Sequence, residues 1–110
     1  KLLIQPWAAP VVIIAGLDER PYQFIEAGYT PYLDLGAAIQ NMLLMAHAHG
    51  LGTCWATFIG ELDLIRRKLK VPEYIKIITY IVLGWPADNP TTVPRMELSE
   101  FVLREQGPRT

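Results

Sequence analysis

The hydrophobic pattern of the chain is dominated by residues 30–60, whose first part is apolar at nearly every helical position. Thr30 is a candidate N-cap and Pro31 suits the first helical position, while Gly50 can take the left-handed conformation that ends a helix. These signals predict a helix over Pro31–His49. Because its apolar residues point in all directions, we expect burial on every side, with a second subunit covering one face.

Three other segments have the composition of strands. Ala9–Gly16 is a β-branched run between a proline and a glycine, which is typical of a strand buried on both faces. Leu51–Phe58 and Tyr74–Leu83 are the other two. A second helix is predicted over Glu61–Lys70, with acidic residues at its start and basic residues near its end, as the helix dipole favours. Its buried stripe is expected to consist of Leu62, Ile65 and Leu69.

These elements predict a single α+β domain over residues 1–110. Its last part, residues 93–104, is predicted to form an arm. The chain starts without methionine and in mid-pattern, so we expect it to lack an N-terminal part. A hydrophobic fraction of 51% indicates that some apolar surface packs against another molecule.

The charge balance narrows the function classes. A net charge of −1 gives no electrostatic case for nucleic acid or an anionic membrane surface. No targeting signal or membrane-spanning run is visible. Cys54 is the single cysteine, which suits a reducing compartment, so we expect a cytoplasmic protein.

Local chemistry is sparse. His47 and His49 lie two residues apart on the predicted helix and point to different sides, so no metal site is expected. Cys54 has no base near it in sequence and is expected to be a buried, inert thiol. Gln40 and Asn41 interrupt an apolar helix, so we expect buried amides that bond across a helix or subunit boundary. These features alone indicate no more than an α+β domain that associates.

The order of the motifs changes this interpretation. Asp34–Trp55 has the pattern D-x-G-x-A-x-Q-N-x-L-L-x-A-x-x-x-G-L-G-T-C-W, Leu83–Pro86 is L-G-W-P, and Arg95 follows after a short loop. Together with Ala9–Ile14, this run resembles the FMN-dependent nitroreductase family. The likeness covers nearly the whole chain but corresponds to the C-terminal half to two-thirds of an ordinary member. The Arg-Arg-Ser motif with which the family binds the FMN phosphate and ribityl chain has no counterpart here.

The resemblance implies an α+β fold with a mixed sheet flanked by helices, formed as an intertwined homodimer around the long helix. The arm after Pro86 would reach the partner subunit. FMN would lie at the dimer interface, with its ring lined by Trp55, Ala56 and Thr57. The backbone N–H near Ile59 and Gly60 would point at flavin N5, and Arg95 would bind the phosphate.

The same resemblance implies an FMN-dependent oxidoreductase. NAD(P)H would reduce the flavin, and a nitroaromatic, a quinone or a related small molecule would then take the electrons. Reductive dehalogenation and flavin-fragmenting chemistry are alternatives within the family. A different class, a flavin-free dimeric remnant that serves as an interaction module, stays open.

Overall fold

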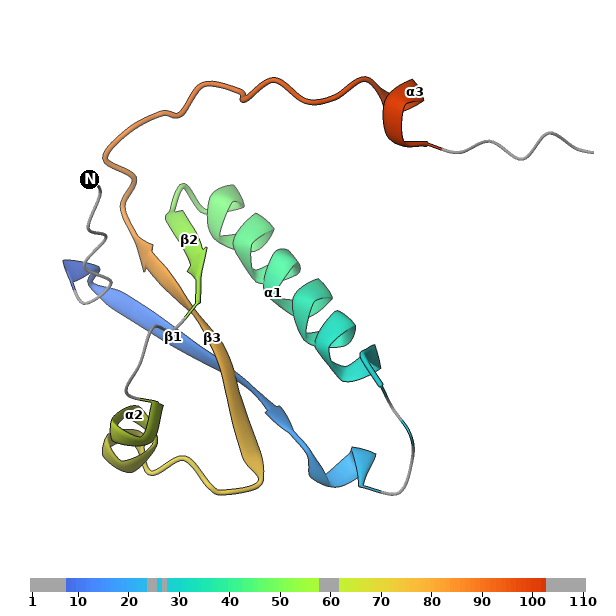
Figure 1. Cartoon of the computed structure of the whole chain (residues 1–110). Helices are drawn as coiled ribbons and strands as arrows, with labels where there is room; N and C mark the ends of the chain where they lie inside the picture. Colours follow the sequence, from blue (N-terminus) through green and yellow to red (C-terminus); the bar gives the residue numbers. More distant parts are fainter. Residues whose placement is uncertain (1–7, 24–25, 27, 58–61, 103–110) are drawn as a thin grey trace, which may run out of the picture.

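The computed structural model describes residues 8–23, 26, 28–57 and 62–102. Its elements follow the predicted order along the chain (Figure 1). They are β1 (Val11–Asp18), the 3-10 turn η2 (Arg20–Tyr22), α1 (Thr30–Ala48), β2 (Gly52–Ala56), α2 (Leu62–Leu69), β3 (Ile75–Gly84) and α3 (Leu98–Phe101). The described part is therefore α+β, as the sequence predicts.

The three described strands form one sheet in the order β1-β3-β2, with β3 in the centre. Both pairings are antiparallel, so the predicted mixed sheet does not occur among the described strands. The prediction that Ala9–Gly16 is buried on both faces is wrong for this sheet. Strand β1 lies at an edge of the described sheet, and its residues are half-buried or exposed in this chain.

The register between β1 and β3 changes in mid-strand. Ala15 faces Thr79 whereas Gly16 faces Ile77, which leaves Ile78 as an extra residue on β3. A Cβ atom at Gly16 would lie 2.9 Å from the Lys76 carbonyl oxygen. The bulge therefore needs glycine at this position, since the two backbones approach too closely for a side chain.

Helix α1 confirms the predicted helix to within one residue at each end. Gly50 has a φ of 76°, as expected for the residue that ends it. The predicted capping role of Thr30 is wrong. The carbonyl of Tyr29 accepts the first helical bonds from the N–H groups of Tyr32 and Leu33, so the cap lies one residue earlier and has no side-chain bond.

One face of α1 packs against the sheet, where it contacts β1 and β2. Ile39 of α1 and Ile81 of β3 are the largest fully buried side chains of the described core. The rest of the helix is uncovered: Leu33 is 70% exposed and Met45 is 61% exposed. All-round burial is therefore not achieved within one chain. Gln40 and Asn41 are exposed as well, which contradicts their predicted burial for the chain by itself.

Two hydrogen bonds from one arginine connect helix α2 to the chain that follows it. Arg66 donates to the carbonyl oxygens of Pro72 at 2.7 Å and Ile75 at 2.8 Å, which joins the helix to the start of β3. The predicted buried stripe is wrong for Leu62 and Leu69, which are exposed, whereas Ile65 is half-buried. The apolar spacing is amphipathic, but no other element of the described chain covers that face.

The segment after β3 leaves the body of the molecule, as Figure 1 shows. Residues 85–102 are exposed throughout and contain one short helix, α3. This confirms an arm at the end of the chain. Its exposed apolar side chains include Val93, Met96, Leu98 and Phe101.

Candidate functional site

The described part of the predicted site lies at the end of β2. Trp55 and Ala56 are the last two residues of the strand, and Thr57 follows it as an exposed residue. The Trp55 side chain is 44% exposed. A Cβ atom placed on Gly36 of α1 would lie 3.8 Å from the indole ring. The ring therefore fits beside a position of α1 that carries no side chain.

A hydrogen-bond relay fixes this end of β2. The Trp55 indole Nε1–H donates to Thr79 Oγ1 at 2.8 Å, and the Thr79 hydroxyl donates in turn to the Ala56 carbonyl oxygen. Thr79 lies on the central strand and is 4% exposed. Sequence reasoning missed Thr79, since its partners lie more than twenty residues away. A threonine in a mainly apolar strand indicates a hydroxyl that needs a partner, but it does not indicate which residues are the partners.

The structure does not place the other predicted site residues next to Trp55, Ala56 and Thr57. Ile59 and Gly60 lie outside the described residues. Arg95 is exposed on the arm, and its guanidinium has no hydrogen bond or ion pair to the described part of the chain. One chain therefore presents the Trp55–Thr57 corner and Arg95 as separate features.

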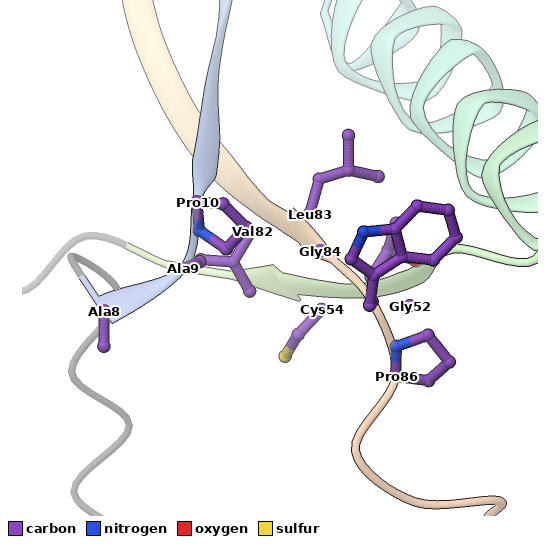
Figure 2. Close-up of a pocket in the computed structure, with 11 residues that line it drawn as sticks. Ala8, Ala9, Pro10, Gly52, Cys54, Val82, Leu83, Gly84 and Pro86 are labelled. Atoms are coloured by element: carbon purple, nitrogen blue, oxygen red, sulfur yellow. The ribbon is translucent and has the colours of Figure 1, made fainter.

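A groove of about 460 Å³ lies at the opposite end of β2 (Figure 2). It is lined by Ala8, Ala9, Pro10, Gly52, Thr53, Cys54, Val82, Leu83, Gly84, Trp85 and Pro86. Gly52 and Gly84 face each other across the strands. A Cβ atom on Gly84 would lie 3.0 Å from Pro10, and one on Gly52 would lie 3.2 Å from Pro86. The glycines let both prolines pack closely on the backbone.

Cys54 faces this groove. Its side chain and that of Leu83 point to opposite sides of the sheet in Figure 2, with Leu83 on the side of α1. The thiol is half-buried, and its sulfur lies 3.9 Å from the Trp55 carbonyl oxygen. Because Cys54 faces away from α1, it is separated by the sheet from the Trp55 indole.

A charged corner joins the start of β3 to β1 and α1. Lys76 donates to the Tyr32 hydroxyl at 2.9 Å, which raises the pKa of Lys76 above its ordinary value. Arg20 is paired with Asp18 at 2.5 Å and lies 3.8 Å from the centre of the Tyr74 ring. The hydrogen bond from Arg20 lowers the pKa of the Asp18 carboxyl. Asp18 is half-buried and the other groups are exposed, and together they connect β1, α1 and β3 rather than enclose a ligand.

Two negative findings hold for the described residues. They contain no group of three or more histidine, cysteine or acidic side chains placed to hold a metal ion. None of their helices combines the length and the apolar composition that crossing a bilayer requires. The predicted cytoplasmic location stays a prediction.

Comparison with known proteins decides the family. The model of the Nitroreductase family matches residues 4–85. The chain belongs to the nitroreductase family. This match includes the Trp55–Thr57 corner, the strand that carries Thr79 and the whole of α1.

Two similar curated proteins support the assignment to this family. A protein of Methanothermobacter thermautotrophicus with the provisional name NADH dehydrogenase/NAD(P)H nitroreductase is 35% identical over 91 residues, covering 76% of this chain and 44% of that protein. The chloronitrobenzene nitroreductase of Comamonas testosteroni is 30% identical over 101 residues, covering 88% of this chain and 40% of that enzyme. The chain thus spans less than half the length of these curated relatives.

A solved structure supports the fold. The FMN-dependent nitroreductase of Clostridium difficile R20291 aligns with a TM-score of 0.67 at 21% identity, covering 88% of this chain and 58% of that one. The nitroreductase-like α+β fold implied by the sequence is confirmed. The dimer and the individual site residues stay predictions.

Proposed function

We propose that the protein to which this chain belongs is an FMN-dependent oxidoreductase that uses NAD(P)H to reduce a nitroaromatic, a quinone or a similar acceptor. The observation that carries the proposal is the family match over residues 4–85, which contains the exposed end of β2. NAD(P)H, a nitroaromatic substrate and FMN each occur in the name of one of the similar proteins described above. Bound FMN supplies the chemistry, accepting electrons from NAD(P)H and passing them to the acceptor.

The residues at the end of β2 suit one edge of a flavin. Trp55 offers a half-exposed aromatic surface whose orientation is fixed by Thr79, and such a surface suits an apolar ring system. Thr57 is exposed next to it. In this proposal Trp55, Ala56 and Thr57 line the ring, and the backbone near Ile59 and Gly60 completes that edge.

Arg95 is proposed to hold the FMN phosphate. Its guanidinium is exposed and has no partner among the described residues, and a planar fork of N–H donors matches phosphate oxygens. The arm on which it lies runs away from the body of its own chain (Figure 1). Arg95 would therefore complete the flavin site of a second subunit.

The proposed assembly is an intertwined homodimer. The outer face of α1 exposes large apolar side chains, among them Leu33, Leu44 and Met45. Such a surface is typical of a protein–protein interface. A second copy that covers this face and receives the arm would bury both features at once.

The test uses the full-length protein purified without added flavin. Visible absorption in the flavin bands, oxidation of NAD(P)H with a nitroaromatic or quinone acceptor, and the mass of a dimer by light scattering are the expected results. A colourless protein that FMN cannot reconstitute would overturn the enzyme and support a flavin-free dimeric module. Flavin binding with release of halide, or with breakdown of the flavin itself, would instead identify one of the alternative activities.

A further inference from the structure

We infer that Thr79 is a positioning residue for the flavin edge at the end of β2. It holds the Trp55 side chain and the Ala56 backbone in one orientation through a single hydroxyl group. This inference rests on the proposed function, since it concerns the corner that would face FMN. It adds a residue from another strand that does not itself touch the cofactor.

The Thr79 hydroxyl both accepts and donates a hydrogen bond. Its oxygen accepts the indole N–H of Trp55 at 2.8 Å, and its proton goes to the Ala56 carbonyl. The indole N–H can only donate and the Ala56 carbonyl can only accept, and in this structure each of them bonds to the hydroxyl of Thr79. A hydroxyl placed between them satisfies both.

The position of Thr79 makes the relay rigid. Thr79 lies on β3, the central strand, and is 4% exposed. Its register partner on β1 is Ala15, next to the point where the register shifts. The β2 corner is thus tied to the most enclosed strand of the described sheet, whereas Thr57 beyond it is exposed.

Fixing this corner has a consequence for chemistry. Trp55 and Ala56 are two of the residues proposed to line the flavin ring, and small displacements of groups that orient reactants slow hydride transfer strongly. Without the Thr79 hydroxyl, the indole can turn away from the Gly36 position and the Ala56 peptide can rotate. We therefore expect Thr79 to affect the orientation of the flavin ring more than the affinity for FMN.

The first experiment tests the relay in full-length apoprotein. The indole N–H resonances of Trp7, Trp55 and Trp85 are recorded by nitrogen-15 NMR and assigned with Trp55→Phe. Thr79→Val should shift the Trp55 resonance, whereas Thr79→Ser should restore it. Thr53→Val is the matched control, because Thr53 lies on β2 and its hydroxyl has no hydrogen bond to the described residues.

Hydrogen exchange in the wild-type protein tests the relay even if Thr79→Val does not fold. The Trp55 indole proton should exchange with solvent more slowly than that of Trp85, which is 79% exposed and has no hydrogen bond to the described residues. A Trp55 resonance unmoved in folded Thr79→Val, or exchange as fast as that of Trp85, would overturn the relay.

The second experiment uses flavin-loaded protein. Reduction of the flavin by NAD(P)H is followed by stopped flow, together with the flavin midpoint potential and FMN affinity. Thr79→Val should slow reduction by about tenfold to a hundredfold with a smaller change in affinity, and Thr79→Ser should recover most of the rate. Equal rates in Thr79→Val and wild type would overturn the inference and leave the proposed function standing. A wild-type protein that binds no FMN would overturn both.

Discussion

Gly16 is the position where one added methyl group should reveal most about the sheet. A Cβ atom there would lie 2.9 Å from both the Lys76 carbonyl oxygen and the Ile75 side chain. The Ile75 methyl can move by rotation, but the carbonyl belongs to the backbone of the central strand. Since ordinary contacts begin at 3.4 Å, Gly16→Ala has to displace that backbone by about 0.5 Å.

The magnitude follows from two opposing effects. Overpacking of this kind costs about 1–3 kcal/mol. Replacing glycine by alanine also restricts the unfolded chain, which offsets about 0.4–1 kcal/mol. The net expectation is a loss of roughly 1–2 kcal/mol in the free energy of unfolding. Because Gly16 faces β3 two residues before Thr79, the displacement should also disturb the bond to Trp55.

The assay is urea unfolding of the full-length protein, followed by circular dichroism and tryptophan fluorescence. Gly36→Ala is the matched control. A methyl at Gly36 meets Trp55 at an ordinary 3.8 Å, and alanine is favoured over glycine inside a helix by about 0.5–1 kcal/mol. The two variants should change stability in opposite directions. If Gly16→Ala were as stable as wild type, the close approach at the bulge would be refuted.

Three further predictions concern assembly, the cofactor and pH. Leu44→Glu should place an unpaired carboxylate in the proposed interface, cost on the order of 3 kcal/mol or more and give monomers by light scattering; an undiminished dimer would contradict the interface. Arg95→Ala should weaken FMN about tenfold to a hundredfold in fluorescence titrations and leave riboflavin unaffected; equal FMN affinity would remove Arg95 from the site. The Asp18 pKa is lowered in the folded protein by Arg20, so its contribution is present above the unfolded pKa and is lost as pH falls through the folded pKa. The stability difference between wild type and Asp18→Asn should therefore shrink below about pH 4, and a difference that grows on acidification would contradict the pairing.

Local signals predicted the elements well. The Pro31 and Gly50 signals placed α1 to within one residue at each end, and the β-branched run of Tyr74–Leu83 located β3 with a shift of one residue. These signals act within a few residues of the chain, where proline and glycine restrict or extend the backbone directly. The N-cap failed because Tyr29 takes a helical conformation and its carbonyl already accepts the first bonds.

Burial was less predictable, since it depends on what the rest of the fold supplies. The composition of Ala9–Gly16 suits a strand buried on both faces, but the residues of β1 are half-buried or exposed in this chain. The apolar face of α2 is uncovered for a similar reason. Of the candidate site, the sequence indicated Trp55, Ala56 and Thr57 by family resemblance. It could not indicate Thr79, because the relay depends on the register between β2 and β3.

The separation of Trp55 and Arg95 has a consequence for how a complete site forms. Trp55 is fixed by a buried hydroxyl on the central strand, whereas Arg95 lies on an exposed arm outside the body of the sheet. Fixing such a segment costs about 1–2 kcal/mol per residue in conformational entropy, so its apolar side chains need a surface on which to pack. In the proposed dimer that surface belongs to the partner. If Arg95 binds the phosphate as proposed, its position relative to the flavin edge would be a property of the assembly, and dimerisation and flavin binding would stabilise each other by linkage.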